Sequence, residues 1–389
     1  MNEEAPPRAD WRDWYRMTSL DRLMEGLSEQ ADLEPGFSRE AFLEWRRPRT
    51  GNDNPSRVLS PVWEWFVRTG LSAYAGNSKF EGPSSFGFEP CWCNDRMGQT
   101  AVDLPDGRLV LVAGEHEDSY SPDFFIYNDV LVLHKDGGVE IYGYPREIFS
   151  PTDFHTSTLT GESIIIIGNL GYPEDRMSGQ TQVFTLNVQT FAMSRLGATG
   201  ELPGWISKHT AELAADGKSI NVTGGEVWRA DNSLVENVDE WKLHLNDWRW
   251  ERLTRRRWPR WSLGRTDGER LHLWEFSQLN WNRQAKWGTE KEEALLKDSL
   301  EGEPDEKAYE SLYRPPVTIA LPREDSEDSR AVRVDVDGVT VRFNSKGCEI
   351  VITIEGALPT DIADVIVEDC RSKLERVERS SVRAIRIAD

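Results

Sequence analysis

One pattern of strands and turns repeats along the chain, and it constrains the fold more than any other feature of the sequence. Each repeat has a polar strand, a turn that ends in glycine, and an almost wholly apolar strand. The turn glycines are Gly107, Gly161, Gly217 and Gly268, which lie 54, 56 and 51 residues apart. Glycine supplies the positive φ that tight hairpins need, and an apolar strand of this kind is typical of burial on both faces. The pattern therefore predicts a row of antiparallel hairpins.

A second strand pair follows the hairpin in each of the first three repeats. These pairs begin at Val130, Val183 and Trp241. Four strands in a repeat of this length match one blade of a β-propeller. The fourth repeat, around Thr266–Trp274, is weaker, and we interpret it as a partial blade.

The third repeat resembles the kelch motif. It carries the glycine pair Gly224-Gly225 after an apolar strand, then Trp241 and Trp250. The other repeats depart from this pattern, since Gly114 and Gly168 are each followed by a residue other than glycine. The resemblance covers about residues 98–254 and implies a mainly β fold, a kelch-like β-propeller of four to five blades.

Three regions are expected along the chain. Residues 1–80 read as a helical segment that packs on the propeller, with helix starts at Ser38 and at Ser60-Pro61. Residues 81–322 are assigned to the propeller, with a charged helical insertion near 289–310. Residues 331–389 read as a small α+β unit of ββαβ order or as a last blade, and the separate unit is favoured.

Charge and cysteine content narrow the classes of function. The formal net charge is −21, from 67 acidic and 46 basic residues. A field of this sign repels nucleic acid and anionic membranes and attracts a basic protein. No signal peptide is recognisable, and the longest apolar run, Ile164–Ile167, is too short to span a bilayer. Four cysteines without a CxxC pair read as reduced thiols, so we expect a cytoplasmic protein.

The expected function is non-catalytic protein binding, without a cofactor, through loops at one face of the propeller. The partner is expected to be a basic protein, and one version is an immunity protein that neutralises a toxin. Charge reversal at the first acidic loop is expected to abolish binding without changing the melting temperature. The candidate contacts are the acidic residues and one histidine of these loops: Glu115, His116, Glu117, Asp118, Asp123, Glu174, Asp175 and Asp231.

An enzymatic reading remains as the alternative, either Fe(II)-dependent or sugar-active with paired carboxylates. Glu236, Glu240 and His244 are spaced four apart. They resemble the Glu-x3-Asp-x3-His iron site of plant specifier proteins, which are kelch propellers, but Glu240 stands where that family has Asp. His155 and His209 occupy equivalent places in successive repeats, which favours a structural role. The cluster from Arg255 to Trp261 is expected to pair with acidic neighbours or to stack Arg on Trp rather than to bind nucleic acid.

Overall fold

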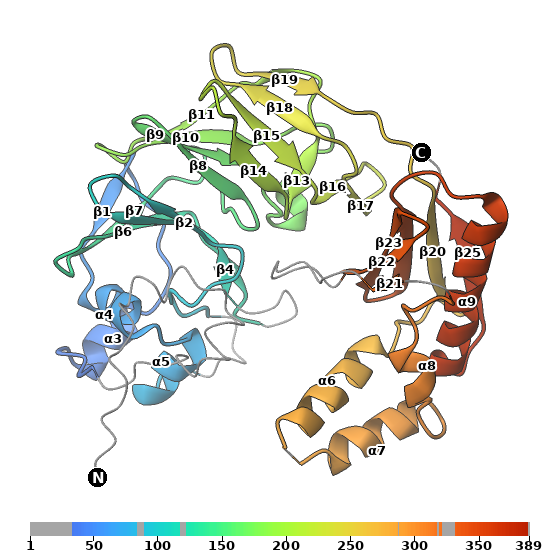
Figure 1. Cartoon of the computed structure of the whole chain (residues 1–389). Coiled ribbons are helices and arrows are strands. Elements are labelled where there is room, and N and C mark those ends of the chain that lie inside the picture. The colour runs from blue at the N-terminus through green and yellow to red at the C-terminus, as the bar shows by residue number, and fades with distance from the viewer. Residues whose placement is uncertain are drawn as a thin grey trace, which may run out of the picture. The chain divides into compact units, whose positions relative to one another are not determined.

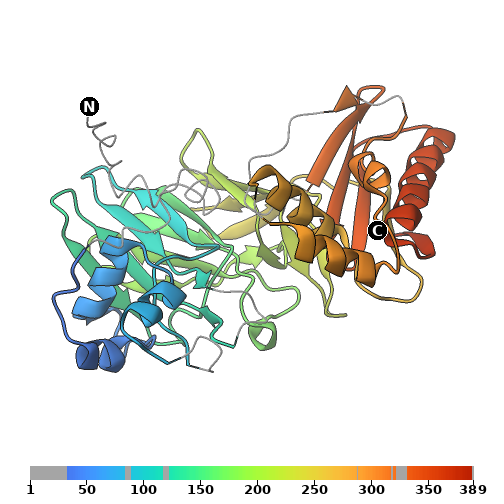
Figure 2. The same cartoon turned by 90° about the horizontal axis from the view of Figure 1, so that it is seen from below.

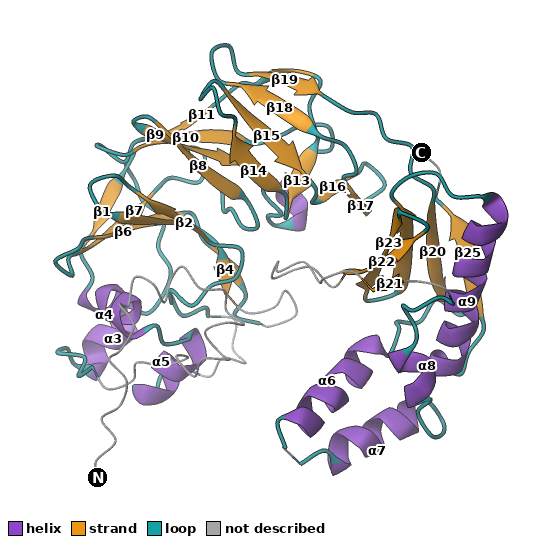
Figure 3. Ribbon diagram, in the orientation of Figure 1, coloured by secondary structure: helices purple, strands orange, loops and turns teal. Residues whose placement is uncertain are grey.

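The computed structural model describes residues 33–83, 89–116, 122–286, 288–316, 319–320 and 331–387. The chain is mainly β, with several antiparallel sheets, and divides into two compact units, Met1–Arg255 and Arg256–Asp389 (Figures 1 and 3). We call these the N-terminal unit and the C-terminal unit and describe each by itself. No helix among the described residues is long and apolar enough to cross a membrane.

The N-terminal unit contains three sheets built from the three clear repeats. The first sheet consists of β1 (Ser56–Val58), β7 (Val139–Gly143), β6 (Asp129–Leu133), β3 (Leu109–Val112) and β2 (Thr100–Asp103). The second consists of β11 (Met193–Arg195), β10 (Val183–Asn187), β9 (Ser163–Ile167) and β8 (Thr156–Thr160). The third consists of β12 (Thr199–Gly200), β19 (Arg249–Arg252), β18 (Trp241–His244), β15 (Ser219–Thr223) and β14 (Thr210–Leu213).

These sheets confirm the predicted four-strand repeats. The turn glycines Gly107, Gly161 and Gly217 all have positive φ, as the hairpins require. Within each repeat all neighbouring strands are antiparallel, and only the added β12 lies parallel to its neighbour β19. The four-strand unit could be predicted because the strands of each repeat follow one another directly in the sequence.

The three sheets differ in how their faces are buried. The first and second sheets share a core in which Val110 and Val132 pack with Ile164 and Ile166. The second and third sheets share another core, which includes Ile165. The outer face of the first sheet is covered by helices, whereas the outer face of the third sheet carries polar residues: Thr210, Glu212, Asn221, Thr223, Lys242, His244, Arg249 and Glu251.

The helical segment before the sheets forms α3 (Arg39–Trp45), α4 (Pro61–Thr69) and α5 (Ala73–Lys79). Ser38 Oγ and Ser60 Oγ accept hydrogen bonds from the first turns of α3 and α4, which confirms both predicted caps. Trp63 stacks on Trp92 with ring centroids 4.6 Å apart, in the core against the first sheet. The prediction of helix throughout was wrong at β1, and residues 1–32 lie outside the described residues.

The C-terminal unit is a six-stranded sheet with helices. In spatial order its strands are β21 (Ile319–Ala320), β22 (Ala331–Val336), β23 (Val339–Lys346), β24 (Glu349–Ile354), β20 (Arg260–Arg265) and β25 (Val382–Arg386). The helices are α6 (Leu273–Gln284), α7 (Glu290–Ser299), α8 (Glu306–Glu310) and α9 (Thr360–Glu378). Figure 2 shows α6 and α7 side by side and α9 along the sheet.

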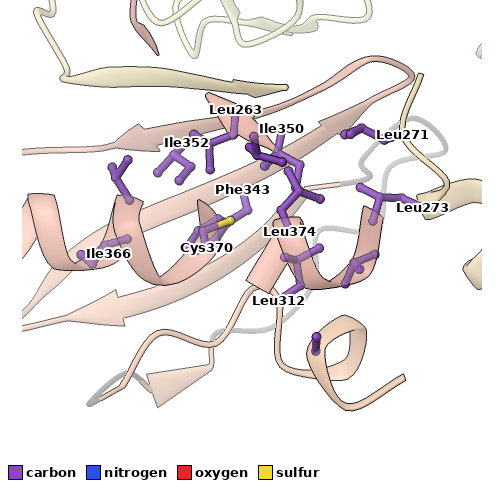
Figure 4. Packing of buried hydrophobic residues seen from close by; sticks show 14 of the residues in the cluster. Leu263, Leu271, Leu273, Leu312, Phe343, Ile350, Ile352, Ile366, Cys370 and Leu374 are labelled. Atoms are coloured by element: carbon purple, nitrogen blue, oxygen red, sulfur yellow. The ribbon is translucent and has the colours of Figure 1, made fainter. Parts of the chain in front are cut away.

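The core of this unit lies between the sheet and its helices. Figure 4 shows Phe343, Ile350 and Ile352 of the sheet directed at Cys370 and Leu374 of α9. All five side chains are fully buried. This core contains only residues of the C-terminal unit, so the unit has an independent source of stability.

Two boundary predictions were wrong. The segment predicted as a fourth blade, around Thr266–Trp274, instead follows β20 of the C-terminal sheet and leads into α6, which begins at Leu273. The C-terminal unit therefore begins at Arg256, not at residue 331. The reason is long-range pairing, because β20 pairs with β24 and β25 rather than with a neighbouring hairpin strand. The predicted insertion helix is α7 and belongs to this unit.

Candidate partner-binding surface

Three loops that leave equivalent strands of the three sheets contact one another. They are the hairpin of β4 (Glu115–His116) and β5 (Phe125–Ile126) after β3, the segment 168–179 with η1 (Pro173–Asp175) after β9, and the hairpin of β16 (Glu226–Trp228) and β17 (Leu234–Glu236) after β15. We call these residues, apart from 117–121, the three-loop surface. Figure 1 shows β4, β16 and β17 on the inner side of the arc of sheets.

Several direct contacts join the three loops into one surface. The backbone N–H of Ile126 donates to the Tyr172 hydroxyl at 2.9 Å. The Arg176 guanidinium lies 4.6 Å from the centroid of the Trp228 ring. β16 also pairs with β13 (Trp205–Ser207), whose Trp205 Nε1 donates to the carbonyl of Leu170 at 3.0 Å. The loops therefore support each other across all three sheets.

Arginine–aromatic pairs line the three-loop surface. Arg176 covers Trp228, and its Nε and terminal nitrogen donate to the carbonyl of Gly171. Arg146, which follows β7, lies 5.6 Å from the Tyr172 ring and forms an ion pair with Asp175 at 2.6 Å. Such pairs pre-order long side chains, because the ring and the carbonyls restrict the arginine rotamers.

A pair of buried carboxyl groups lies beneath this surface. Asp153 is fully buried and Glu115 is 8% exposed, and the two carboxyl groups lie close enough to interact electrostatically. Asp153 Oδ1 also accepts from the N–H of Gly171 at 2.6 Å. Burial raises the pKa of Asp153, so this carboxyl group holds a proton more tightly than a solvated one would.

His116 and Asp123 are also buried and do not present charge to solvent. The Tyr127 hydroxyl and His116 Nδ1 are 2.8 Å apart. Burial lowers the pKa of His116 to about 3, so its imidazole is neutral near pH 7. Burial raises the pKa of Asp123, whose side chain is 2% exposed. Both side chains are therefore part of the interior beneath the β4–β5 hairpin and not of its exposed surface.

The predicted acidic face thus needs correction. Glu115, His116 and Asp123 are buried, and Asp175 is neutralised by Arg146. Glu174 and Asp231 are exposed, and Asp231 also accepts from Ser233 within its turn. Glu117 and Asp118 lie outside the described residues. Charge reversal at Glu115 would disturb the buried carboxyl pair, so we now expect it to lower stability as well as any binding.

Sequence reasoning missed the residues that give this surface its character. Arg146, Tyr172, Arg176 and Trp228 were not candidates, although two of the predicted contact loops contain three of them. Their pairing joins residues that are 26 and 52 positions apart, from different sheets. A count of arginine and aromatic residues in the loops was the available signal, because these residue types dominate binding hot spots.

The alternative iron site is not assembled. His244 lies in β18, where its Nε2 is 2.8 Å from Glu251 of the neighbouring strand. Glu236 lies opposite Glu226 in a different sheet, and the Glu240 N–H donates to Thr254. Within the described ranges, no group of three His, Cys, Asp or Glu side chains could hold a metal ion. In a helix, side chains four residues apart lie on the same face and close together. In an extended chain the same spacing keeps them far apart.

The basic cluster is paired as expected at its first residue. Arg255 donates two hydrogen bonds to Glu201, at 3.0 and 2.6 Å. Arg256 lies 4.9 Å from the centroid of the Trp258 ring. Arg260 is only 6% exposed and lies in β20. The cluster is therefore divided between local pairing and the interior of the C-terminal unit.

Comparisons with known proteins give little further information. No family model matches the chain, and no curated protein matches it. Among solved structures, "Structure of YjhT" is 14% identical, with a TM-score of 0.28. The match covers 42% of this chain and 52% of that one, so this chain spans about half the length of that protein. At this TM-score the likeness carries no argument.

Proposed function

We propose that the protein is a cytoplasmic protein-binding module that captures its partner on the three-loop surface. The observation that carries the proposal is the contact of arginine and aromatic side chains from three consecutive sheets. Tyr172, Arg176 and Trp228 are half-buried, and each is held in place by a second loop. Arg, Tyr and Trp are the residue types that contribute most to protein–protein affinity.

The scaffold is proposed to be a kelch-like propeller assembly. The support is the repeat of four-stranded antiparallel sheets whose first strands are consecutive neighbours, since β2 contacts β8 and β8 contacts β14. The adjoining loops are the usual binding elements of such rigid scaffolds. The glycine pair and the late tryptophan of the third repeat add to this support.

The partner is proposed to be a basic protein, and an immunity protein that neutralises a toxin is one version of this role. The support is the net charge of −21, together with exposed Glu174 and Asp231 on the three-loop surface. A field of this sign accelerates the approach of a basic partner more than it strengthens the final contact.

Affinity capture of the tagged full chain from its native cell lysate tests this proposal. We expect one basic protein to be recovered in a stoichiometric amount, and we expect its recovery to fall as salt rises. A Trp274→Ala variant serves as a control, because Trp274 is 51% exposed but belongs to α6 of the C-terminal unit. Capture of an acidic partner, or capture that is insensitive to salt, would contradict the proposed partner chemistry.

A further inference from the structure

Strand β25 forms one edge of the C-terminal sheet and pairs only with β20 among the described strands. The Thr266 N–H donates to the carbonyl of Ser381, and the Ile387 N–H donates to the carbonyl of Arg260. In an antiparallel ladder, alternate residues direct both backbone groups to the same neighbour. Arg383 and Ile385 therefore face β20 with their backbone groups, whereas Val382, Ala384 and Arg386 direct theirs outward.

The outward groups are satisfied at only one of these three residues. The Val382 N–H donates to Glu375 Oε1 at 3.1 Å, and its carbonyl accepts from Arg371 at 3.4 Å, both from α9. In the part of the chain that the structure describes, no residue bonds to the outward backbone groups of Ala384 or Arg386. Among the described residues, the opposite edge strand, β21, has two residues. β25 therefore offers the longer unpaired edge.

The side chains around this edge are exposed and basic. Arg383 through Arg386 are all exposed, and Ile385 is 49% exposed. Arg386 lies 5.7 Å from the Trp261 ring, and no ion pair joins Arg383 to a described residue. In a chain of net charge −21, this strand is a local patch of positive charge with an apolar residue at its centre.

We propose that the outer edge of β25 binds an extended acidic segment of a partner protein, which adds a strand to the sheet. Backbone hydrogen bonds to Ala384 and Arg386 supply affinity, and acidic side chains opposite Arg383 and Arg386 supply selectivity. A second copy of this chain fits less well. Its β25 would bring a second Arg383 and Arg386 to an edge that is already basic, and repulsion between like charges opposes that pairing.

Peptide binding to the full chain tests the proposal, independently of the three-loop surface. The probes are a fluorescent peptide with Glu at every third position between Val residues, so that Glu side chains can lie opposite both Arg383 and Arg386, and a matched peptide with Lys in place of Glu. Binding of each is followed by anisotropy. We expect the acidic peptide to bind and the basic one not to bind. Ala384→Pro removes an outward N–H and leaves the ladder to β20 intact, so it should weaken binding about tenfold.

Arg383→Glu should weaken binding of the acidic peptide by a similar factor, and it decides the test if Ala384→Pro does not fold. Arg249→Glu is the matched control, because it makes the same charge change on the third sheet of the N-terminal unit. In the free protein, the amide hydrogens of Ala384 and Arg386 should exchange faster than those of Arg383 and Ile385. The acidic peptide should slow the exchange of the Ala384 and Arg386 amide hydrogens.

Three outcomes would overturn the proposal. One is that the wild-type chain binds neither peptide or binds both equally. Another is unchanged affinity in Ala384→Pro and Arg383→Glu. The third is that the wild-type chain dimerises in sedimentation experiments and Ala384→Pro abolishes the dimer, since a second copy would then occupy this edge.

Discussion

At the scale of single residues, two histidines join successive sheets in the same way. His155 Nε2 is 2.8 Å from the Thr100 hydroxyl, and His209 Nε2 is 2.9 Å from the Thr156 hydroxyl. Each contact links the residue before one sheet to the first strand of the preceding sheet. Both imidazoles are buried, and burial lowers both pKa values to about 3. These positions support the structural role that their equivalence in the repeat suggested.

Neutral buried histidines make the N-terminal unit sensitive to acid. Their pKa in the unfolded chain is about 6.5, so below that pH the unfolded state takes up protons that the folded state does not. Stability should therefore fall as pH falls from 6.5 toward 3, by about 1.4 kcal/mol per pH unit for each histidine. Buried Asp123 and Asp153 act in the opposite direction, because their raised pKa values favour protonation of the folded state.

A His155→Gln/His209→Gln variant isolates the histidine contribution. Between pH 7.5 and 5.5 the wild-type protein should lose about 2 to 3 kcal/mol more unfolding free energy than this variant. Urea unfolding at the two pH values measures the difference. An identical pH dependence in both proteins would show that these histidines do not set the acid sensitivity.

At the scale of elements, the buried strands of the first two sheets supply most members of the core that these sheets share. Ile166 of β9 is fully buried in the core shared by these sheets. Ile166→Ala should therefore lower the unfolding free energy by about 2–5 kcal/mol. The control Leu59→Ala removes a side chain that is 75% exposed and should change it by less than about 0.5 kcal/mol. Equal effects in chemical denaturation would contradict the assigned burial.

Most of these elements were predictable because their signals are local. The apolar strand β9 reads directly from the four consecutive isoleucines Ile164–Ile167, and the caps at Ser38 and Ser60 read from single residues. The sheet that Arg260–Arg265 joins was not predictable in this way. Its strand partner β24 lies about ninety residues further along the chain, and the Asp267-Gly268 turn after it leads into a helix instead of a second strand.

The candidate site was less predictable than the fold. Its loops were identified, but the burial of Glu115 and Asp153 depends on contacts between sheets, which the sequence does not show. The partners of Arg146 and Arg176 are likewise set by the packing of one loop on another. Local composition located the surface, and only three-dimensional packing separated its exposed residues from its buried ones.

At the scale of the whole molecule, the two units share no hydrophobic core, and this predicts two unfolding transitions. The core of the C-terminal unit contains no residue before Arg256, and Leu374 of α9 is fully buried in it. In calorimetry, Leu374→Ala should lower the Tm of one transition, and Ile166→Ala should lower that of the other. If both substitutions shift a single common transition, the two units unfold as one.

The binding proposal also belongs to this scale, because the three-loop surface requires all three sheets of the N-terminal unit. Titration calorimetry of the captured partner against wild-type protein, Trp228→Ala and the control Trp274→Ala tests it most directly. We predict that Trp228→Ala raises Kd at least about tenfold with little change in Tm, as expected for a hot-spot residue, and that Trp274→Ala leaves Kd unchanged. Wild-type affinity in Trp228→Ala would show that the partner binds elsewhere.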